Sequence, residues 1–90
     1  MEKFSNVAKI FKAFDDEKRL QILKMLSEGE KCACVLLESL NISQPTLSHH
    51  MKILCESKMV SCERRGKWCY YSISQFGIKN AINFLKTFEE

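Results

Sequence analysis

The sequence has little of what marks membrane, secreted or disordered chains. Only one proline and three glycines occur among 90 residues, of which 46% are hydrophobic, so neither a low-complexity nor a disordered chain is expected. The longest unbroken apolar run, 32–37, is far shorter than the roughly 18 residues of a membrane span. The segment 1–14 is amphipathic and charged, and it lacks the continuous apolar core and cleavage site of a signal peptide. We therefore expect a globular, cytoplasmic protein without a membrane partner.

The sequence also lacks the motifs of the common enzyme classes. Neither a glycine-rich phosphate-binding loop nor a His-Glu-x-x-His zinc-protease motif is present. A cysteine–histidine nucleophile would have to use His49 or His50, but both fall in a helix with another predicted role, and no obvious oxyanion hole accompanies them. The sequence therefore predicts a protein that is not an enzyme and has no organic cofactor.

The net charge is small, but the charges are unevenly distributed. Fourteen Lys and Arg against eleven Asp and Glu give +3, which is too little to indicate nucleic-acid binding by itself. Acidic residues lie early in the chain and at its end, whereas Arg64, Arg65 and Lys67 surround one glycine. A local basic cluster on a nearly neutral chain is typical of a protein that contacts DNA at one defined place.

The spacing of apolar residues predicts four helices before the chain reaches Val60. The first ends near Phe14, Asp15 and Asp16 offer an N-cap for the second, and the third ends near Leu40. Ser43 is a favourable N-cap for the fourth, and Pro45 falls in its first turn, where a missing N–H costs little. The positions expected to form apolar faces are Phe4, Val7, Ala8, Phe11, Phe14, Leu20, Ile22, Leu23, Leu26, Leu36, Leu37, Leu40, Leu47, Met51 and Leu54.

From Val60 the hydrophobic period changes to two, which predicts two strands around an Arg-Gly turn. A symmetric hairpin centred between Arg65 and Gly66 places Cys62 directly opposite Cys69. Directly opposed residues have Cβ atoms about 4.5–5.5 Å apart, close to what a disulfide or a shared metal ion needs. A packed and reduced pair is the interpretation we favour here, because apolar residues share the same face of the hairpin.

A last helix is predicted from about Gln75, with Ala81, Ile82, Leu85 and Phe88 on one face. Two short helices joined by a three-residue turn and followed by a β-hairpin indicate a mainly α fold, the winged helix-turn-helix. Chains of this length rarely support two cores, so we expect a single domain over residues 1–90. The first and last helices are then left to bury their apolar faces in a homodimer, which suits DNA with two half-sites about one turn apart.

Three segments together resemble the ArsR/SmtB family of winged-helix repressors of bacteria and archaea. They read FDDEKRLQILKML, KCACVLLESLNISQPTLSHHMKIL and MVSCERRGKWCYYSI, and they cover about residues 14–73. The CxC at 32–34 is similar to that of the arsenic- and cadmium-sensing branch, and Gly-Lys-Trp at 66–68 resembles the arsenic repressors. The resemblance implies a repressor that binds double-stranded operator DNA with an inverted repeat and is released by a soft metal or metalloid.

The sequence departs from that family's patterns at three places. Arsenic repressors of the best-known type carry a third Cys three residues after the CxC, where this chain has Leu37. Cadmium and lead sensors take further Cys from an amino-terminal arm, and no Cys precedes Cys32 in this sequence. The Asp and His pattern of the zinc sensors is absent from 77–90, which argues against zinc sensing by the last helix.

Five cysteines in a cytoplasmic chain indicate metal binding, catalysis or packing rather than disulfides. Cys32 and Cys34 are expected in an extended segment, where residues i and i+2 point to one side and can both reach one soft ion. The favoured effector is trivalent arsenic or antimony, which takes three thiolates, with cadmium or lead as alternatives. The third thiolate would come from Cys55, a partner-chain Cys or an external thiol. Packing as small buried side chains is the competing interpretation, and for Cys55 the favoured one.

The helix predicted over 43–56 is the candidate DNA reader. Its first turns present short donors for phosphates, an amide suited to adenine and an imidazole suited to a guanine acceptor, whereas His50 is expected to pack and hydrogen-bond inside. The basic hairpin tip is expected to contact phosphates or the minor groove, with plain surface charge as the alternative. The residues predicted to contact DNA are Ser43, Gln44, Thr46, Ser48, His49, Lys52, Arg64, Arg65 and Lys67.

These patterns favour a homodimeric repressor that leaves its operator when a metalloid binds Cys32 and Cys34. Drawing the two thiols around an ion should strain or unwind the adjacent helix and change the spacing of the two reading helices, with a coupling of roughly 1–3 kcal/mol. Two alternatives remain. One is a repressor switched by oxidation of the CxC or of the hairpin thiols, and the other is a DNA-binding or protein-interaction module whose cysteines are structural.

Overall fold

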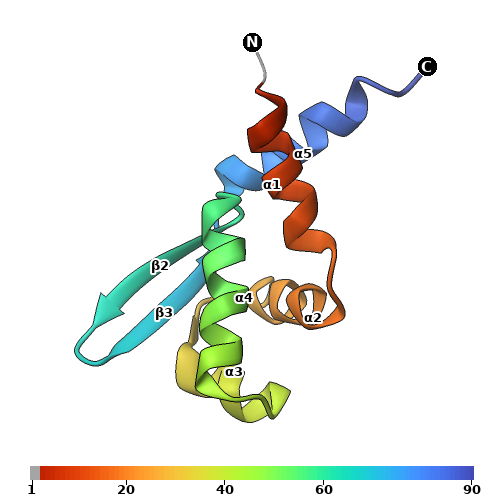
Figure 1. Ribbon diagram of the computed structural model, residues 1–90. Coiled ribbons are helices and arrows are strands. Elements are labelled where there is room, and N and C mark those ends of the chain that lie inside the picture. Colours follow the sequence, from red (N-terminus) through yellow and green to blue (C-terminus); the bar gives the residue numbers. More distant parts are fainter. Residues whose placement is uncertain (1–2) are drawn as a thin grey trace.

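The computed structural model describes residues 3–90, so the first two residues of the predicted domain lie outside it. The described residues form a mainly helical fold with one small sheet (Figure 1). The helices are α1 (Phe4–Phe14), α2 (Glu17–Leu26), α3 (Ala33–Leu40), α4 (Gln44–Glu56) and α5 (Gln75–Lys86), and the strands are β1 (Lys31–Cys32), β2 (Val60–Arg65) and β3 (Trp68–Ile73). The predicted winged helix-turn-helix is confirmed, with α3 and α4 as its helices and β2–β3 as its wing. None of these helices is both long and apolar enough to cross a membrane.

Side-chain caps fix where α2 and α4 begin. Asp16 caps α2, because its Oδ1 accepts hydrogen bonds from the backbone N–H groups of Lys18 at 2.8 Å and Arg19 at 3.1 Å. Ser43 caps α4, and its Oγ accepts from the N–H of Thr46 at 3.3 Å. Both caps were predicted from the sequence, and each is of a kind that stabilises a protein by about 1 kcal/mol. The start of α4 in turn decides which of its residues face outward.

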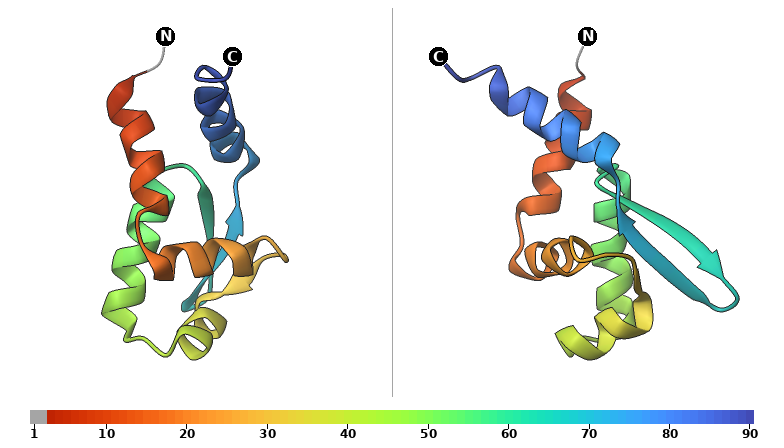
Figure 2. Two further views of the ribbon diagram at one scale, coloured as in Figure 1. Left: turned by 90° about the vertical axis from the view of Figure 1, so that its right-hand side faces the viewer. Right: turned by 180° about the vertical axis from the view of Figure 1, so that it is seen from behind.

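The core surrounds α4. Figures 1 and 2 show this helix between α2 and the wing, with α1 alongside its carboxyl-terminal half. The stripe predicted on α4 is buried, and side chains from α2, α3 and the start of the wing pack against it. The largest fully buried side chains of this core are Ile22, Leu36, Leu54 and Met59.

Helix α1 buries a different face from the predicted one. Its core residues are Ile10 and Ala13, whereas Phe4 is 77% exposed. Phe11 packs beside Phe84 of α5, with ring centroids 6.0 Å apart. The smaller Ile10 and Ala13 allow α1 to approach α4 and α2, and this orientation leaves the Phe-rich face of α1 turned toward α5 and the solvent.

The register of the wing also differs from the predicted one. Cys62 pairs with Tyr71 and not with Cys69, because the loop is centred between Gly66 and Lys67, one residue later than expected. Of these two loop residues, Gly66 has a positive φ of 63°, and Lys67 does not. That pattern is typical of a type II′ turn, which takes glycine at its first central position. The prediction that the two wing thiols are directly opposed is therefore wrong.

A third strand joins the wing and places the start of α3 against it. Strand β1 pairs with β3 to give the order β1-β3-β2, with Lys31 opposite Tyr71 and Cys32 opposite Tyr70. The sequence predicted an extended segment here but not its pairing, because two residues are too short to show a period. The pairing sets Cys32 beside the middle of the wing.

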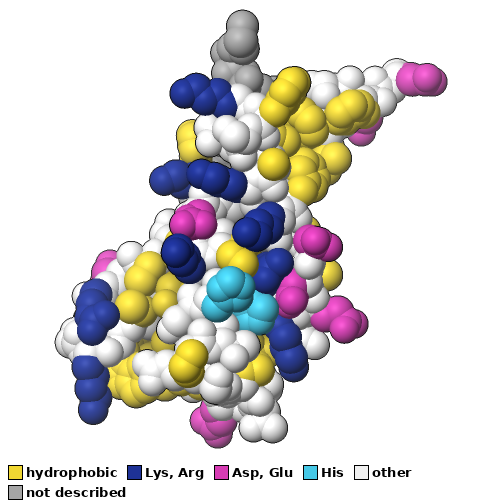
Figure 3. Space-filling model, viewed as in Figure 1, with side chains coloured by type: hydrophobic (Ala, Val, Ile, Leu, Met, Phe, Trp, Pro, Cys, Tyr) yellow, Lys and Arg dark blue, Asp and Glu magenta, His cyan; other side chains and the backbone are white. Residues whose placement is uncertain are grey.

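One end of the molecule exposes large apolar side chains. Figure 3 shows them gathered where α1 and α5 lie, and Figure 2 shows the start of α1 and the end of α5 at this same end. On α5 the predicted core position Ala81 is buried, whereas Ile82 and Leu85 are 45% and 52% exposed. Phe88, also predicted on this face, lies past the end of the helix and is 71% exposed. Within one protomer the predicted apolar face of α5 is therefore mostly uncovered.

Candidate DNA-binding surface and thiol sites

Helix α4 turns a polar face outward. Its inward positions belong to the core stripe, so the positions between them face solvent, and Figure 3 shows histidine side chains on this side of the molecule with basic side chains around them. The residues predicted to contact DNA from α4 and its cap are all exposed: Ser43, Gln44, Thr46, Ser48, His49 and Lys52. The structure thus brings this predicted set together on one surface.

The outer end of the wing is basic. Arg64 near the end of β2 and Lys67 in the loop are exposed, and Figure 3 shows basic side chains at this end of the wing. The wing projects from the same body that presents α4, as Figure 1 shows. The two surfaces together form an arrangement suited to one helix in a groove and a basic hairpin against the backbone.

Arg65, the third basic residue of the tip, is exposed but already paired with other residues of the protein. Its Nη1 and Nη2 donate to the two carboxylate oxygens of Glu30 at 2.8 and 3.0 Å, and its Nε donates to Glu63. Its Cζ also lies 4.5 Å from the centroid of the Tyr70 ring. The hydrogen bonds to Glu63 and Glu30 raise the pKa of Arg65, so its charge is permanent and already paired. Arg65 therefore joins the wing to the segment before β1, and its predicted contact with DNA requires that bridge to open.

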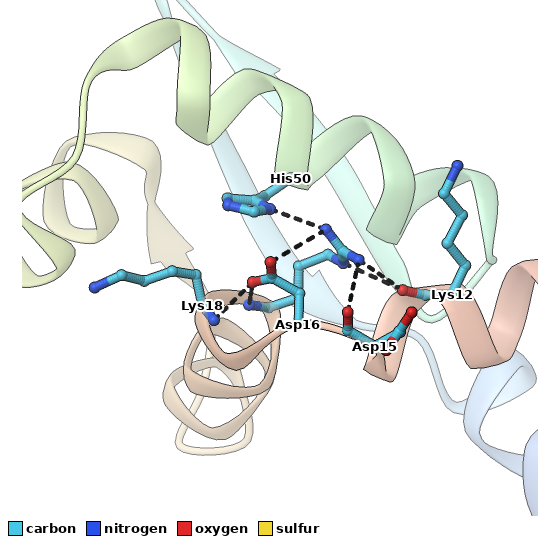
Figure 4. Close-up of polar contacts among 6 residues, drawn as sticks. Lys12, Asp15, Asp16, Lys18 and His50 are labelled. Carbon is cyan, nitrogen blue, oxygen red and sulfur yellow. Dashed lines mark hydrogen bonds and ion pairs between the residues drawn. The ribbon is translucent and has the colours of Figure 1, made fainter.

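A buried arginine joins α1, α2 and α4 (Figure 4). Arg19 donates to the carbonyl oxygen of Lys12 through Nε at 3.2 Å and Nη2 at 2.9 Å, and its Nη1 lies 3.1 Å from Nδ1 of His50. Because arginine is only a donor, Nδ1 of His50 must accept, which leaves the ring proton on Nε2. The predicted internal role of His50 is confirmed. The sequence assigned Leu20 to this face, but Leu20 is 43% exposed and Arg19 is buried beside it.

Cys32 and Cys34 bring their sulfur atoms into contact where β1 meets α3. Cys32 is the N-cap of α3, and its Sγ accepts from the backbone N–H of Cys34 at 3.4 Å and from the Cys34 thiol at 2.6 Å. The sequence predicted that both would lie in one extended segment, but Cys34 already belongs to the first turn of α3. Capping geometry, and not strand alternation, brings the two sulfur atoms together. Cys32 is buried and Cys34 is exposed, so the pair is open to solvent on one side.

The two thiols differ in their tendency to ionise. Burial raises the pKa of Cys32, but hydrogen bonds from the Cys34 thiol and backbone and from the Tyr70 hydroxyl outweigh it, so the pKa is lowered. The pKa of Cys34 is raised, first because its thiol donates to Cys32 and then because of burial. Cys32 is therefore the sulfur that ionises first, and the thiolate is the form that binds metals and acts as a nucleophile.

The predicted third ligand does not lie with this pair. Cys55 instead lines a groove with Cys62 and Tyr71, between α4 and the wing. Cys32 instead contacts Tyr70, and neighbouring residues of a strand point to opposite faces, so the two groups of thiols lie on opposite sides of β3. Across residues 3–90, no three His, Cys, Asp or Glu side chains are close enough together to hold a metal ion as they stand.

Sequence reasoning missed Glu30 and Tyr70. Both act through the pairing of β1 with β3, since Cys32 lies opposite Tyr70 and Glu30 precedes β1. No local pattern indicates this long-range contact. The usable signal was the unassigned tyrosine next to the predicted basic tip, because a tyrosine that alternates outward from a wing commonly finds a polar or cationic neighbour.

The comparisons with known proteins agree with this geometry. The model of a family described as "Bacterial regulatory protein, arsR family" matches residues 16–61. An uncharacterised helix-turn-helix transcriptional regulator of Methanocaldococcus jannaschii is 42% identical over 94% of this chain and 97% of its own length. An arsenical resistance operon repressor of Staphylococcus aureus is 44% identical over 91% of this chain and 79% of its own length. The homodimeric winged helix-turn-helix DNA-binding domain of a Mycobacterium bovis protein superposes with a TM-score of 0.76 at 25% identity, covering 93% of this chain and 78% of that one.

Proposed function

Because the chain belongs to the arsR family of bacterial regulatory proteins, we propose that it is a homodimeric repressor released from its operator by a metalloid at Cys32 and Cys34. Proteins of this family are DNA-binding transcriptional regulators, so the chain is a transcriptional repressor and not an enzyme. The observation that carries the finer proposal is the contact between the two sulfur atoms at the first turn of α3.

A second copy of the chain is the proposed partner of the apolar end formed by α1 and α5. Phe4, Phe76 and Leu85 are 77%, 67% and 52% exposed there, and side chains of this size are rarely left uncovered together on a soluble protein. The similar M. bovis domain is a homodimer. Pairing through this end would set two copies of α4 in a two-fold relation, which suits an operator with an inverted repeat.

The proposed DNA contacts are those of α4 and the wing. The exposed amide and hydroxyl groups at the start of α4 are suited to base edges and phosphates, and Lys52, Arg64 and Lys67 are suited to phosphates. Because the net charge is only +3, these local contacts, and not the electrostatic field of the whole protein, must supply the affinity for DNA. Binding should accordingly weaken as salt is raised, in proportion to the number of phosphates contacted.

Trivalent arsenic or antimony is the proposed effector. A similar protein is named an arsenical resistance operon repressor, and soft thiolate ligands select ions of this character. Two thiols condense with arsenous acid to form two As–S bonds and release two waters, which leaves one hydroxyl on arsenic. A third thiol from the partner chain or from a small external thiol would replace that hydroxyl as a further water leaves. Cadmium and lead are the alternatives, because they select thiolates as well.

The proposed coupling begins at the cap of α3. The sulfur of Cys32 accepts the hydrogen bond that caps this helix and lies near the Tyr70 hydroxyl, and a covalent bond to arsenic would reorient this sulfur and weaken both contacts. Loss of a cap weakens the first turn of a helix, and α3 has only eight residues to hold the position of α4. The guanidinium of Arg65 stacks over the Tyr70 ring, so arsenic binding at Cys32 would also disturb the wing through Tyr70.

The proposal is tested with the whole chain and a duplex that the protein itself selects from a random pool. Fluorescence anisotropy would report the fraction bound while arsenite, antimonite, cadmium or lead is added under reducing conditions. Release by arsenite or antimonite at lower concentration than by cadmium or lead is the expected order. A duplex that stays bound at saturating concentrations of all four ions would contradict the proposal.

A second candidate is a repressor switched by oxidation, and the same sulfur contact favours it. Peroxide would convert the Cys32 and Cys34 thiols to one disulfide while being reduced to two waters, with the Cys32 thiolate as the attacking group. Titration of free thiols before and after peroxide separates the two candidates. Release that follows the loss of two thiols per chain, without any added ion, would favour the oxidative switch.

A further inference from the structure

Three thiols outside the Cys32–Cys34 pair lie between α4 and the wing: Cys55 and Cys62 line a groove there, and Cys69 lies on the same face of the wing. Cys55 comes from the last turns of α4, Cys62 from β2 and Cys69 from β3. The groove has a volume of about 220 Å³, and its lining includes Cys55, Cys62 and the Tyr71 ring.

The register of the wing places both wing thiols on the face that packs against α4. Cys62 is opposite Tyr71, and Cys69 precedes Tyr71 by two residues, so all three side chains leave the sheet on the same side. Cys62 and Cys69 are thus diagonal neighbours and not an opposed pair. Val60, on the same face of β2, is buried against the core, which identifies this side as the one facing α4.

The surroundings of Cys55 and Cys62 raise the pKa of both thiols. Burial raises the pKa of Cys62 to about 11, with a further contribution from its hydrogen bond with Cys69 and from Cys55. Burial and the nearby Cys69 raise the pKa of Cys55. The raised pKa values of Cys55 and Cys62 favour their neutral thiol form, whereas the pKa of Cys32 is lowered.

We propose that Cys55, Cys62 and Cys69 form a second binding site for a trivalent metalloid hydroxide, which ties the wing to the reading helix. The groove is lined by Cys55 and Cys62 with Lys52 and no carboxylate or imidazole, and Cys69 is diagonal to Cys62 on the same face of the wing. A trigonal thiophilic ion is what three sulfur ligands suit. The site is separate from the Cys32–Cys34 pair because it lies across β3 from it.

The chemistry favours a hydroxide over a divalent cation. Arsenous acid condenses with three thiols to form three As–S bonds and three waters, arsenic stays trivalent, and each thiol proton leaves in a water molecule. Cadmium or zinc must instead displace the protons into solution, which is harder for thiols whose pKa is raised. Neutral thiols in a groove therefore suit arsenite or antimonite.

Binding requires the three thiols to close around the ion. They are not assembled in the described structure, since no three side chains of residues 3–90 are placed to hold a metal ion. Cys55 lies one turn beyond Lys52 on α4, and Cys69 pairs with Arg64. Closure would therefore fix the angle between α4 and the wing, which carry the proposed DNA contacts. This effect on DNA binding rests on the proposed function, whereas the binding of arsenic at the three thiols does not.

The test measures bound arsenic and uses no DNA. The full chain carrying Cys32→Ser and Cys34→Ser is reduced, incubated with arsenite, passed through a desalting column and analysed for arsenic and protein. We expect about one arsenic per protomer, and clearly less when Cys62→Ser is added, because the two remaining thiols can form only two of the three As–S bonds. No retained arsenic in the first variant would overturn the proposal.

A matched control moves the thiol by one residue. Adding Ser61→Cys to the Cys62→Ser variant keeps the number of thiols but places the new sulfur on the opposite face of β2. Arsenic retention should stay low in that variant, and its recovery would overturn the proposal. Circular dichroism confirms that each variant is folded, and Cys62 is an exposed residue whose replacement leaves the core intact. Failure of this site would leave the Cys32–Cys34 proposal untouched, because those residues are absent from the tested protein.

Discussion

The guanidinium of Arg65 in the wing lies 2.8 and 3.0 Å from the two carboxylate oxygens of Glu30, which precedes Cys32 by two residues. This bridge connects a proposed DNA contact to the segment that carries the proposed effector site. Both side chains are largely exposed, so the bridge adds little to the stability of the protein. Its importance is in deciding whether the charge of Arg65 is available to DNA.

Replacing Glu30 with Ala should release Arg65 toward DNA. We expect tighter operator binding at low salt and a plot of log affinity against log salt that is steeper by up to about one phosphate contact. Unfolding by urea should change by less than about 1 kcal/mol, as for other exposed ion pairs. Glu28→Ala is the matched control, because Glu28 lies in the same loop and pairs with Lys31 instead. An unchanged salt slope in Glu30→Ala would show that Arg65 does not reach the DNA.

The contact of His50 with Arg19 predicts a loss of stability in mild acid. Burial lowers the pKa of His50 in the folded protein, Asp16 partly offsets this, and the charges of Arg19, His49 and Lys18 lower it further. As the pH falls below the ordinary value of 6.5, the unfolded chain takes up this proton before the folded one does. The free energy of unfolding should therefore be highest above pH 6.5 and should decrease as the pH falls below it.

The matched variants for this prediction are His50→Asn and His49→Gln. Asparagine offers Arg19 an acceptor oxygen in place of Nδ1 but does not titrate, so urea midpoints of His50→Asn should depend less on pH between about 5 and 7. His49 is exposed, and its replacement should leave the pH dependence of the wild type in place. Equal pH dependence in His50→Asn and the wild type would count against this assignment.

Much of the fold could be predicted because its signals are local. The caps at Asp16 and Ser43, the core stripe of α4 and the change of period at Val60 each depend on residues close together in sequence. The features that could not be predicted are those that depend on residues distant in the sequence. Arg19 is buried because His50 and a backbone carbonyl satisfy it, and the side chain alone gives no sign of this.

The candidate sites show the same division. The outward face of α4 followed from its buried stripe, so every predicted α4 contact is exposed. The error in the wing register came from placing Gly66 second in its turn, and that single step separated Cys62 from Cys69. The same error in register hid the fact that Cys55 lies near the wing thiols. Register depends on the turn conformation, and a shift of one residue in the turn centre changes every cross-strand pair.

Gly77 of α5 allows the last helix to pack against the root of the wing. A Cβ added there would clash with the backbone carbonyl of Lys58 and lie 2.8 Å from Cα of Met59. Backbone atoms at this position cannot move aside, so Gly77→Ala should destabilise the protein by about 2 kcal/mol or more, measured by urea unfolding. Asn80→Ala, at an exposed position of the same helix, is the control and should have a small effect. A neutral Gly77→Ala would contradict this packing.

Gln44 and Lys67 should affect DNA binding in different ways. Gln44 is exposed at the start of α4, where its amide can read a base edge, so Gln44→Ala should cost about 1–3 kcal/mol on the selected duplex and relax the preference at one position of each half-site. Lys67→Ala should instead weaken binding to all sequences similarly and reduce the salt slope by about one. Competition with single-position variants of the duplex measures both effects. Equal losses of specificity in the two variants would contradict these roles.

The central claim is that occupation of Cys32 and Cys34 weakens the grip on DNA, and two matched proteins test it most directly. Both carry Cys62→Ser to remove the second thiol site, and one also carries Cys32→Ser and Cys34→Ser, where serine at 32 can still cap α3. Operator affinity is measured by anisotropy with and without saturating arsenite. The account predicts an affinity about 5- to 150-fold weaker with arsenite for the protein that keeps the pair, and no change for the protein that lacks it. Equal affinity with and without arsenite in the protein that keeps Cys32 and Cys34 would contradict the account.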